Sequence, residues 1–122
     1  MTPKPEVWVV VTTCPEREVA DELATLLVAE GLAACAQVGA PVVSRYVWQG
    51  KTCCEREIPL TLKVCGDRLD RCLERLRTVH PYTVPELLAW PCPVADAAYR
   101  DWVCASASPE TGNGPPVPED GS

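Results

Sequence analysis

Apolar and polar residues alternate most regularly over residues 42–64, and this pattern predicts one long β-hairpin. In its second half the apolar residues recur at every second position, at Ile58, Leu60, Leu62 and Val64. A period of two is expected of a strand that buries one face. Gln49-Gly50 lies between the two halves, where glycine adopts a positive φ without a steric penalty.

The predicted hairpin is long for so small a chain, because its arms have about ten residues each and most strands are shorter. Such arms extend past their own core. The first arm carries Tyr46 and Trp48, two aromatic side chains that need a cover. We therefore expect another copy of the chain to cover the hairpin.

The rest of the pattern predicts strands and helices on either side of the hairpin. The expected strands are an unbroken apolar run over residues 6–12, a second strand over 32–38 and a short one over 86–90. The expected first helix has one apolar face and ends at Gly31; that face carries Val19, Ala20, Leu23, Leu26 and Leu27. A second helix is expected to open at Gly66-Asp67 and to stop at His80, because Pro81 disfavours helical backbone before it.

Polar residues predict how the two outer helices begin. Thr13 and Glu16 have the spacing of a capping box, with Pro15 in the first turn of the helix. Asp96 is expected to cap a third helix, which would carry Tyr99, Trp102 and Val103 inward. Pro59 lacks an N–H, so we expect it beside an edge or a bulge, and residues 39–41 are the expected break in the strand.

This order of elements, β-α-β-β-α-β with a terminal helix, predicts an α+β fold of the ferredoxin-like kind. Two helices would cover one face of an antiparallel sheet, with right-handed crossovers. We expect one domain over residues 1–105, and a disordered tail over 106–122, where proline and glycine are frequent. Strand directions would place Cys14, Cys53, Cys54 and His80 at the hairpin end of the sheet, and Cys35 and Cys65 at the other.

The composition limits the classes of partner that we expect for this chain. The net charge is −6 and the eleven basic residues are dispersed, so nucleic-acid binding is not expected. No apolar run is long enough to span a membrane, and none resembles a secretion signal. We therefore expect a cytoplasmic protein with no membrane partner, whose eight cysteines are reduced and mostly buried.

Several short sequence motifs occur together in a recognisable order along the chain. They are Thr12-Thr13-Cys14-Pro15, Leu32-Ala33-Ala34-Cys35, Tyr46-Val47-Trp48-Gln49-Gly50-Lys51, Lys63, His80-Pro81-Tyr82-Thr83-Val84-Pro85-Glu86 and the residues from Tyr99 to Trp102. Over residues 7–104 the chain resembles the CutA family of divalent-cation tolerance proteins. The resemblance implies a homotrimer with exchanged hairpins, a role in tolerance of copper and other divalent metals, and an architecture similar to that of PII signalling trimers.

The resemblance also implies where copper ligands would lie. The positions that match the family's proposed ligands hold Thr12, Val79 and His80, so only one of the three ligands, His80, is kept. Cys14 is the expected substitute, because a helix N-terminus lowers the pKa of a thiol. The predicted metal ligands are Cys14 and His80, completed by Cys53, Cys54 or an acid. The cofactor would be copper or another divalent cation.

Two alternatives to this metal site stay open. Hydrogen bonding with backbone at the helix end is the more common role for a histidine placed as His80 is, and packing as a buried thiol is the more common role for Cys14. The adjacent Cys53 and Cys54 would offer two thiolates that hold Cu(I) without any histidine.

The sequence lacks G-x-S-x-G, H-E-x-x-H and a phosphate loop, so we expect no enzymatic activity. A pocket between subunits is expected from the aromatic and charged residues Tyr46, Trp48, Glu57, Lys63, Tyr82 and Glu86, which are equally suited to a trimer core. The favoured function is a homotrimer of metal tolerance that binds divalent cations weakly. The alternatives are a PII-like signalling trimer that senses a small anion or metabolite in inter-subunit clefts, and an assembly factor without a ligand.

Overall fold

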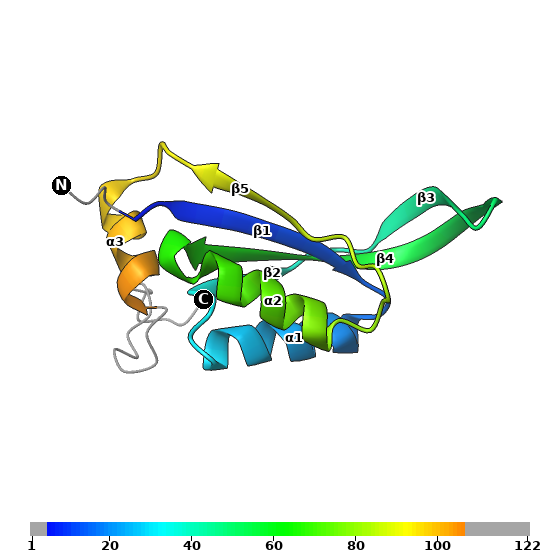
Figure 1. The fold of residues 1–122 in the computed structure, drawn as a ribbon, viewed down its shortest axis with the longest axis horizontal. Coiled ribbons are helices and arrows are strands. Elements are labelled where there is room, and N and C mark those ends of the chain that lie inside the picture. The colour runs from blue at the N-terminus through cyan, green and yellow to red at the C-terminus, as the bar shows by residue number, and fades with distance from the viewer. Residues whose placement is uncertain (1–4, 107–122) are drawn as a thin grey trace.

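A long hairpin projects from one end of an antiparallel sheet in the computed structural model, which describes residues 5–106 (Figure 1). The strands are β1 (Val7–Cys14), β2 (Cys35–Val38), β3 (Val42–Trp48), β4 (Lys51–Cys65) and β5 (Leu88–Cys92). The helices are α1 (Arg17–Ala29), α2 (Leu69–Val79) and α3 (Ala97–Ser106), with a 3-10 turn at Gly66–Arg68 before α2. Within these residues no helix is both long and apolar enough to cross a membrane.

The sheet has the order β2-β4-β1-β5, and β3 pairs with the outer part of β4. All of these pairs are antiparallel. Helices α1 and α2 lie together on one face of the sheet (Figure 1). Between helices and sheet lies the main core, whose fully buried members include Leu27, Leu60, Leu62 and Leu76. The ferredoxin-like α+β fold expected from the sequence is confirmed. The expected tail after residue 106 lies outside the described residues.

The two ends of α1 differ in how well the sequence predicts them. Strand β1 continues through Thr13 and Cys14, which pair with Pro59 and Ile58, so the predicted capping box is wrong. The helix begins at Arg17, after an extended Glu16 that makes no side-chain cap bond. At the other end Gly31 has a φ of 73° as predicted, and backbone bonds from Gly31 to Val28 and from Leu32 to Leu27 complete a Schellman motif.

The hairpin forms as predicted, with positive φ at both turn residues, 51° for Gln49 and 78° for Gly50. This pair of angles matches the right-handed twist of the two strands. Beyond the sheet the hairpin leaves apolar side chains uncovered in the single chain: Val43 is 61% exposed, Val47 69% and Trp48 50%. The predicted break between β2 and β3 also forms. There Gly39 N–H donates to the Pro59 carbonyl over 2.9 Å, and a Cβ on Gly39 would lie only 2.9 Å from Pro59 Cγ.

Helix α3 is attached to the far end of β4 by a disulfide between Cys65 and Cys104, whose Cα atoms are 4.9 Å apart. The expectation of reduced cysteines is therefore wrong for this pair, while the other six are free. Register explains the contact, because Cys65 is the last residue of β4 and faces α3 beside Val7. Asp96 accepts a hydrogen bond from Tyr99 N–H over 3.1 Å and caps the helix as predicted.

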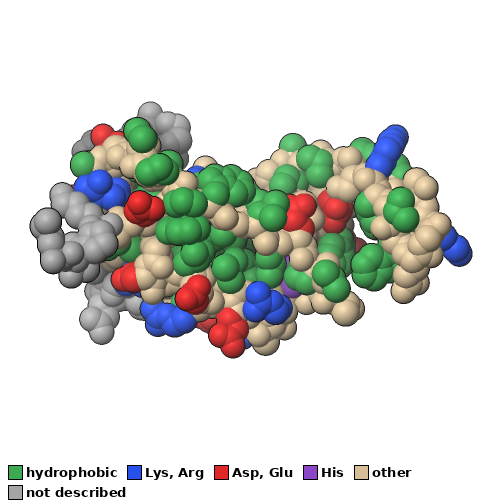
Figure 2. Space-filling model, turned by 45° about the horizontal axis from the view of Figure 1, so that its top comes forward, with side chains coloured by type: hydrophobic (Ala, Val, Ile, Leu, Met, Phe, Trp, Pro, Cys, Tyr) green, Lys and Arg blue, Asp and Glu red, His purple; other side chains and the backbone are tan. Residues whose placement is uncertain are grey.

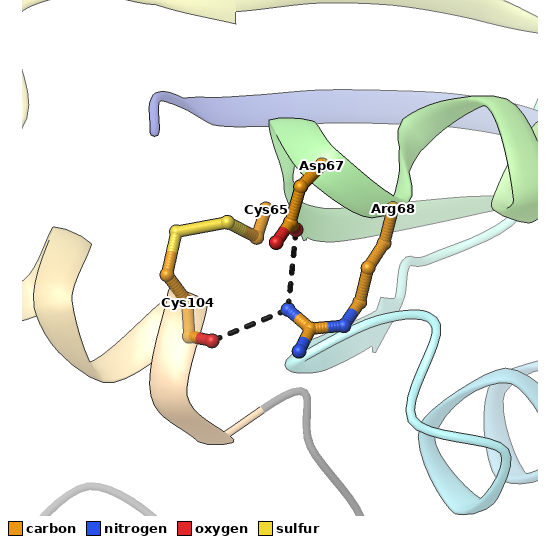
Figure 3. A network of polar contacts seen from close by, with 4 residues as sticks. All are labelled: Cys65, Asp67, Arg68 and Cys104. Carbon is orange, nitrogen blue, oxygen red and sulfur yellow. Dashed lines mark hydrogen bonds and ion pairs between the residues drawn. A yellow bond between two sulfur atoms is a disulfide. The ribbon is translucent and has the colours of Figure 1, made fainter. Parts of the chain in front are cut away.

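Two further features define the α3 end. Arg68 Nη1 donates to the Cys104 carbonyl over 3.2 Å and pairs with Asp67 over 3.3 Å, beside the disulfide (Figure 3). Val103 is fully buried, as predicted for the inward face of α3. Tyr99, in contrast, is 36% exposed and stacks on Trp102, so its predicted inward position is wrong.

Candidate functional site

A groove of about 720 Å³ lies between the base of the hairpin and the loop that joins α2 to β5. Figure 2 shows this side of the molecule as a hollow between the body and the hairpin, with acidic side chains beside it. The groove is lined by Thr13, Ser44, Arg45, Tyr46, Trp48, Glu55, Glu57, Pro81, Tyr82, Thr83, Val84 and Glu86. Its concave shape and its convergent polar and aromatic side chains make it the candidate binding site.

The pairing of β3 with β4 determines which side chains reach the groove. Ser44 pairs with Glu55 and Tyr46 with Cys53, so these residues share one face of the hairpin with Trp48 and Glu57. The residues between them, including Arg45, belong to the opposite face. This face of the hairpin therefore carries aromatic and acidic residues, with Lys51 opposite Trp48 at its tip, and the loop over residues 80–86 approaches it.

His80 joins this loop to β1. Its Nε2 lies 2.9 Å from the Thr13 carbonyl oxygen, and its Nδ1 lies 3.1 Å from the backbone nitrogen of Tyr82. A carbonyl only accepts and an N–H only donates, so Nε2 carries the proton and Nδ1 is the acceptor. Burial lowers the pKa of His80, against the opposing effects of Thr13 and Glu57. Both ring nitrogens are occupied, and neither has a lone pair free for a metal ion.

Tyr82 and Glu57 form the inner wall of the groove. The Tyr82 hydroxyl donates to Glu57 Oε2 over 2.9 Å. The centroids of the Tyr82 and His80 rings are 5.0 Å apart. Burial, with the hydrogen bond and charge of Glu57, raises the pKa of Tyr82 far above its usual range. Glu57 is only 9% exposed, so the structure holds a largely buried carboxylate at this wall.

The groove is acidic. Its lining includes three carboxyl groups, those of Glu55, Glu57 and Glu86, and one guanidinium, that of Arg45. Within residues 5–106, none of these carboxylates takes part in an ion pair. Burial raises the pKa of Tyr46, and the charges of Glu55 and Glu57 raise it further, which reflects the same negative field. A positively charged ligand is the kind that this field attracts.

The structure brings together most of the pocket residues expected from the sequence. Tyr46, Trp48, Glu57, Tyr82 and Glu86 all line the groove. Lys63 does not, because it lies further along β4, opposite Cys35, and its Nζ donates to Gln37 Oε1 over 2.7 Å. The sequence analysis missed Ser44 and Glu55, although the hairpin alternation places both on the same face as Tyr46. It also missed Thr13, whose carbonyl position depends on the docking of the distant His80 loop.

The predicted metal ligands do not fit a metal ion in this arrangement. Cys14 ends β1 inside the core instead of starting a helix, so burial, followed by the charge of Glu57, raises the pKa of its thiol to about 11. The expected lowering of this pKa is wrong. Thr12, on the same face of β1, has a buried hydroxyl without a hydrogen-bond partner, but a neutral hydroxyl is a weak ligand for copper.

Cys53 and Cys54 do not form a joint site either. They are adjacent on β4, so their side chains point to opposite faces of the hairpin and do not converge on one ion. Cys53 Sγ lies 3.7 Å from the Lys51 carbonyl oxygen. Over residues 5–106 no group of three or more His, Cys, Asp and Glu side chains is arranged to hold a metal ion.

Known proteins resemble the chain over this whole region. A family model described as CutA1 divalent ion tolerance protein matches residues 8–106. The divalent-cation tolerance protein CutA of Thermus thermophilus is 39% identical over 95 residues, which are 78% of this chain and 92% of the relative. CutA of Citrobacter koseri is 40% identical over 102 residues, 84% of this chain and 89% of the relative. The crystal structure of CutA from Xylella fastidiosa has a TM-score of 0.81 at 33% identity and covers 84% of this chain and 99% of that chain.

Proposed function

The chain belongs to the CutA1 family of divalent ion tolerance proteins, and from this premise we propose that it is a non-enzymatic homotrimer that binds divalent cations weakly. The cations are held by carboxylates of the groove, with Glu57 as the main ligand. Copper is the first ion to test, because Cu²⁺ binds a given site more tightly than the other divalent ions of its row.

One observation carries the cation part of the proposal. Glu57 is 9% exposed, lines the groove and has no ion-pair partner within the described residues. A largely buried carboxylate costs free energy unless a cation or hydrogen bonds compensate its charge. The hydroxyl of Tyr82 supplies one hydrogen bond, and within the described residues no cationic side chain pairs with this carboxylate. A bound cation would supply the remainder.

The expected affinity is low for two reasons. The softer ligands His80 and Cys14 are taken up by backbone hydrogen bonds and by burial. The carboxylates that remain are spread along the groove and are not gathered into a cluster. A cation held by single carboxylates is easily displaced by water. Such weak, reversible binding is better suited to buffering the cation concentration than to holding a fixed cofactor.

The trimer part of the proposal has a separate basis. On the face of the hairpin opposite to the groove, Val43 and Val47 leave exposed apolar side chains in the single chain. Exposed apolar surface of this kind marks an interaction site. We expect sedimentation equilibrium to give three times the monomer mass; a stable monomer at micromolar concentration would remove this part of the proposal.

The cation part is tested by calorimetric titration of Cu²⁺ and Mn²⁺ into wild type and Glu57→Gln, with Glu18→Gln as the matched control. Glutamine keeps the shape and the bond to Tyr82 but removes the charge. We expect Glu57→Gln to weaken both ions at least several-fold, and the exposed Glu18 on α1 to have no effect. Equal binding by all three proteins, or a loss only when Cys53 and Cys54 are replaced by serine, would show that the groove is not the site.

The alternative of a signalling trimer that senses a small anion is not favoured by this groove. Three carboxylates against one guanidinium make its potential negative, and the guanidinium belongs to Arg45 on the opposite face of the hairpin. An anion would have to bind against this field.

A further inference from the structure

A metal ion would use only part of the groove. The volume of about 720 Å³ falls within the range of sites that hold small organic ligands, roughly 300–1,000 Å³. Its walls include the rings of Tyr46, Trp48 and Tyr82. A hydrated divalent ion needs oxygen ligands but no aromatic surface, so the size and the rings are not explained by the divalent-cation proposal.

The acidic and aromatic groups follow one another along the groove, from its inner wall toward the tip of the hairpin. Glu57 lies at the buried inner wall, held by Tyr82. Tyr46 and Trp48 follow on the same face of β3 toward the hairpin tip, and both are partly exposed. A ligand with a positive head and a short apolar body would meet a carboxylate with its head and aromatic faces with its body. Aromatic rings also attract cations directly through their negative faces.

We propose that the groove binds a small organic cation, a primary ammonium or guanidinium group on a short alkyl chain, with its charge at Glu57 and its chain against Trp48 and Tyr46. The proposal goes beyond metal tolerance and does not depend on metal binding, but it requires that Tyr46 and Trp48 remain open to the groove in the assembled protein. An organic cation and a divalent ion would compete, because both use the carboxylate of Glu57.

The remaining groups of the groove agree with a cationic occupant. Arg45 is the one cationic residue in the lining of the groove, and within the described residues it forms no ion pair with Glu57. His80 is held neutral by its two backbone hydrogen bonds and adds no positive charge to the groove. Glu55 and Glu86 extend the negative field past the inner wall. A ligand with two ammonium groups would therefore bind more tightly than one with a single group.

The test uses four probes of the same chain length, observed through tryptophan fluorescence and calorimetry: butylammonium, 1,4-diaminobutane, 1-butanol and butyrate. We expect wild type to bind 1,4-diaminobutane more tightly than butylammonium, and to bind neither the alcohol nor the acid. Glu57→Gln should weaken both amines roughly tenfold or more, since a hydrogen bond to a charged group is lost. Glu18→Gln should bind as wild type does.

Three outcomes would overturn the inference. Wild type that fails to bind either amine at millimolar concentration, equal binding of amine and alcohol, or amine binding unchanged in Glu57→Gln would each do so. If Glu57→Gln instead changes the sedimentation of the protein and no amine binds, the groove is filled by a neighbouring copy and the inference is wrong. Loss of Cu²⁺ and Mn²⁺ affinity in Glu57→Gln without any amine binding would leave the proposed function standing and the amine proposal refuted.

Discussion

At the scale of single residues, His80 does more for the groove by its hydrogen bonds than it would as a metal ligand. It connects the Thr13 carbonyl at the end of β1 to the Tyr82 N–H at the start of the loop. Tyr82 in turn holds Glu57. The inner wall of the groove thus depends on a neutral imidazole, whose Nδ1 must keep its lone pair.

This dependence predicts a loss of stability at acid pH. Burial depresses the folded-state pKa of His80 below its ordinary value of 6.5, so the unfolded state binds the proton more readily. The contribution of His80 to stability is therefore complete above pH 6.5 and is lost as pH falls toward the folded pKa. His80→Ala should cost about 1–3 kcal/mol at neutral pH, because a buried carbonyl and a buried N–H lose their partner. Urea unfolding from pH 7.5 to 5 checks both effects; an equally steep pH dependence in wild type and His80→Ala would contradict the assignment.

At the scale of elements, local patterns predicted most of the fold, and long-range contacts account for what they missed. The hairpin and the end of α1 follow from the alternation over residues 58–64 and from Gly31, which are local signals. The start of α1 does not, because Thr13 and Cys14 are drawn into β1 by pairing with Pro59 and Ile58, more than forty residues away. Five of the six predicted pocket residues line the groove, but their convergence depends on the loop over residues 80–86 docking against a distant hairpin.

The disulfide is another long-range feature, and it leads to a prediction about α3. Cys65 and Cys104 are 39 residues apart, and no local pattern links them. Closing a loop of this length in the unfolded chain contributes about 4 kcal/mol by the chain-entropy account. Dithiothreitol should therefore lower the melting temperature of wild type, and the Cys65→Ser/Cys104→Ser double variant should melt lower and not respond to the reductant. Wild type that melts alike with and without dithiothreitol, and whose mass after alkylation shows eight free thiols, would contradict this pairing.

At the scale of the whole molecule, one end of the sheet is closed and buried, and the other is open and exposed. The α3 end is closed by the disulfide and by the Arg68 contacts, and Val7, Cys65 and Val103 are buried there (Figure 3). The hairpin end is open, with an aromatic and acidic face over the groove and exposed Val43 and Val47 on the other face. A net charge of −6 favours the approach of cations to the molecule as a whole. We assign cation binding and assembly to the hairpin end of the molecule.

The central claim, that cations bind at Glu57 in the groove, is tested most directly by locating a bound ion. Mn²⁺ is paramagnetic and broadens the NMR signals of nearby amides, so substoichiometric Mn²⁺ added to ¹⁵N-labelled protein reports where the ion resides. We predict that the amide signals of Glu55, Glu57, Tyr82 and Glu86 broaden most. In Glu57→Gln these signals should broaden no more than those of the rest of the protein. Broadening centred on Cys14, on Cys53 and Cys54, or spread evenly over the acidic residues of α1 would contradict the account.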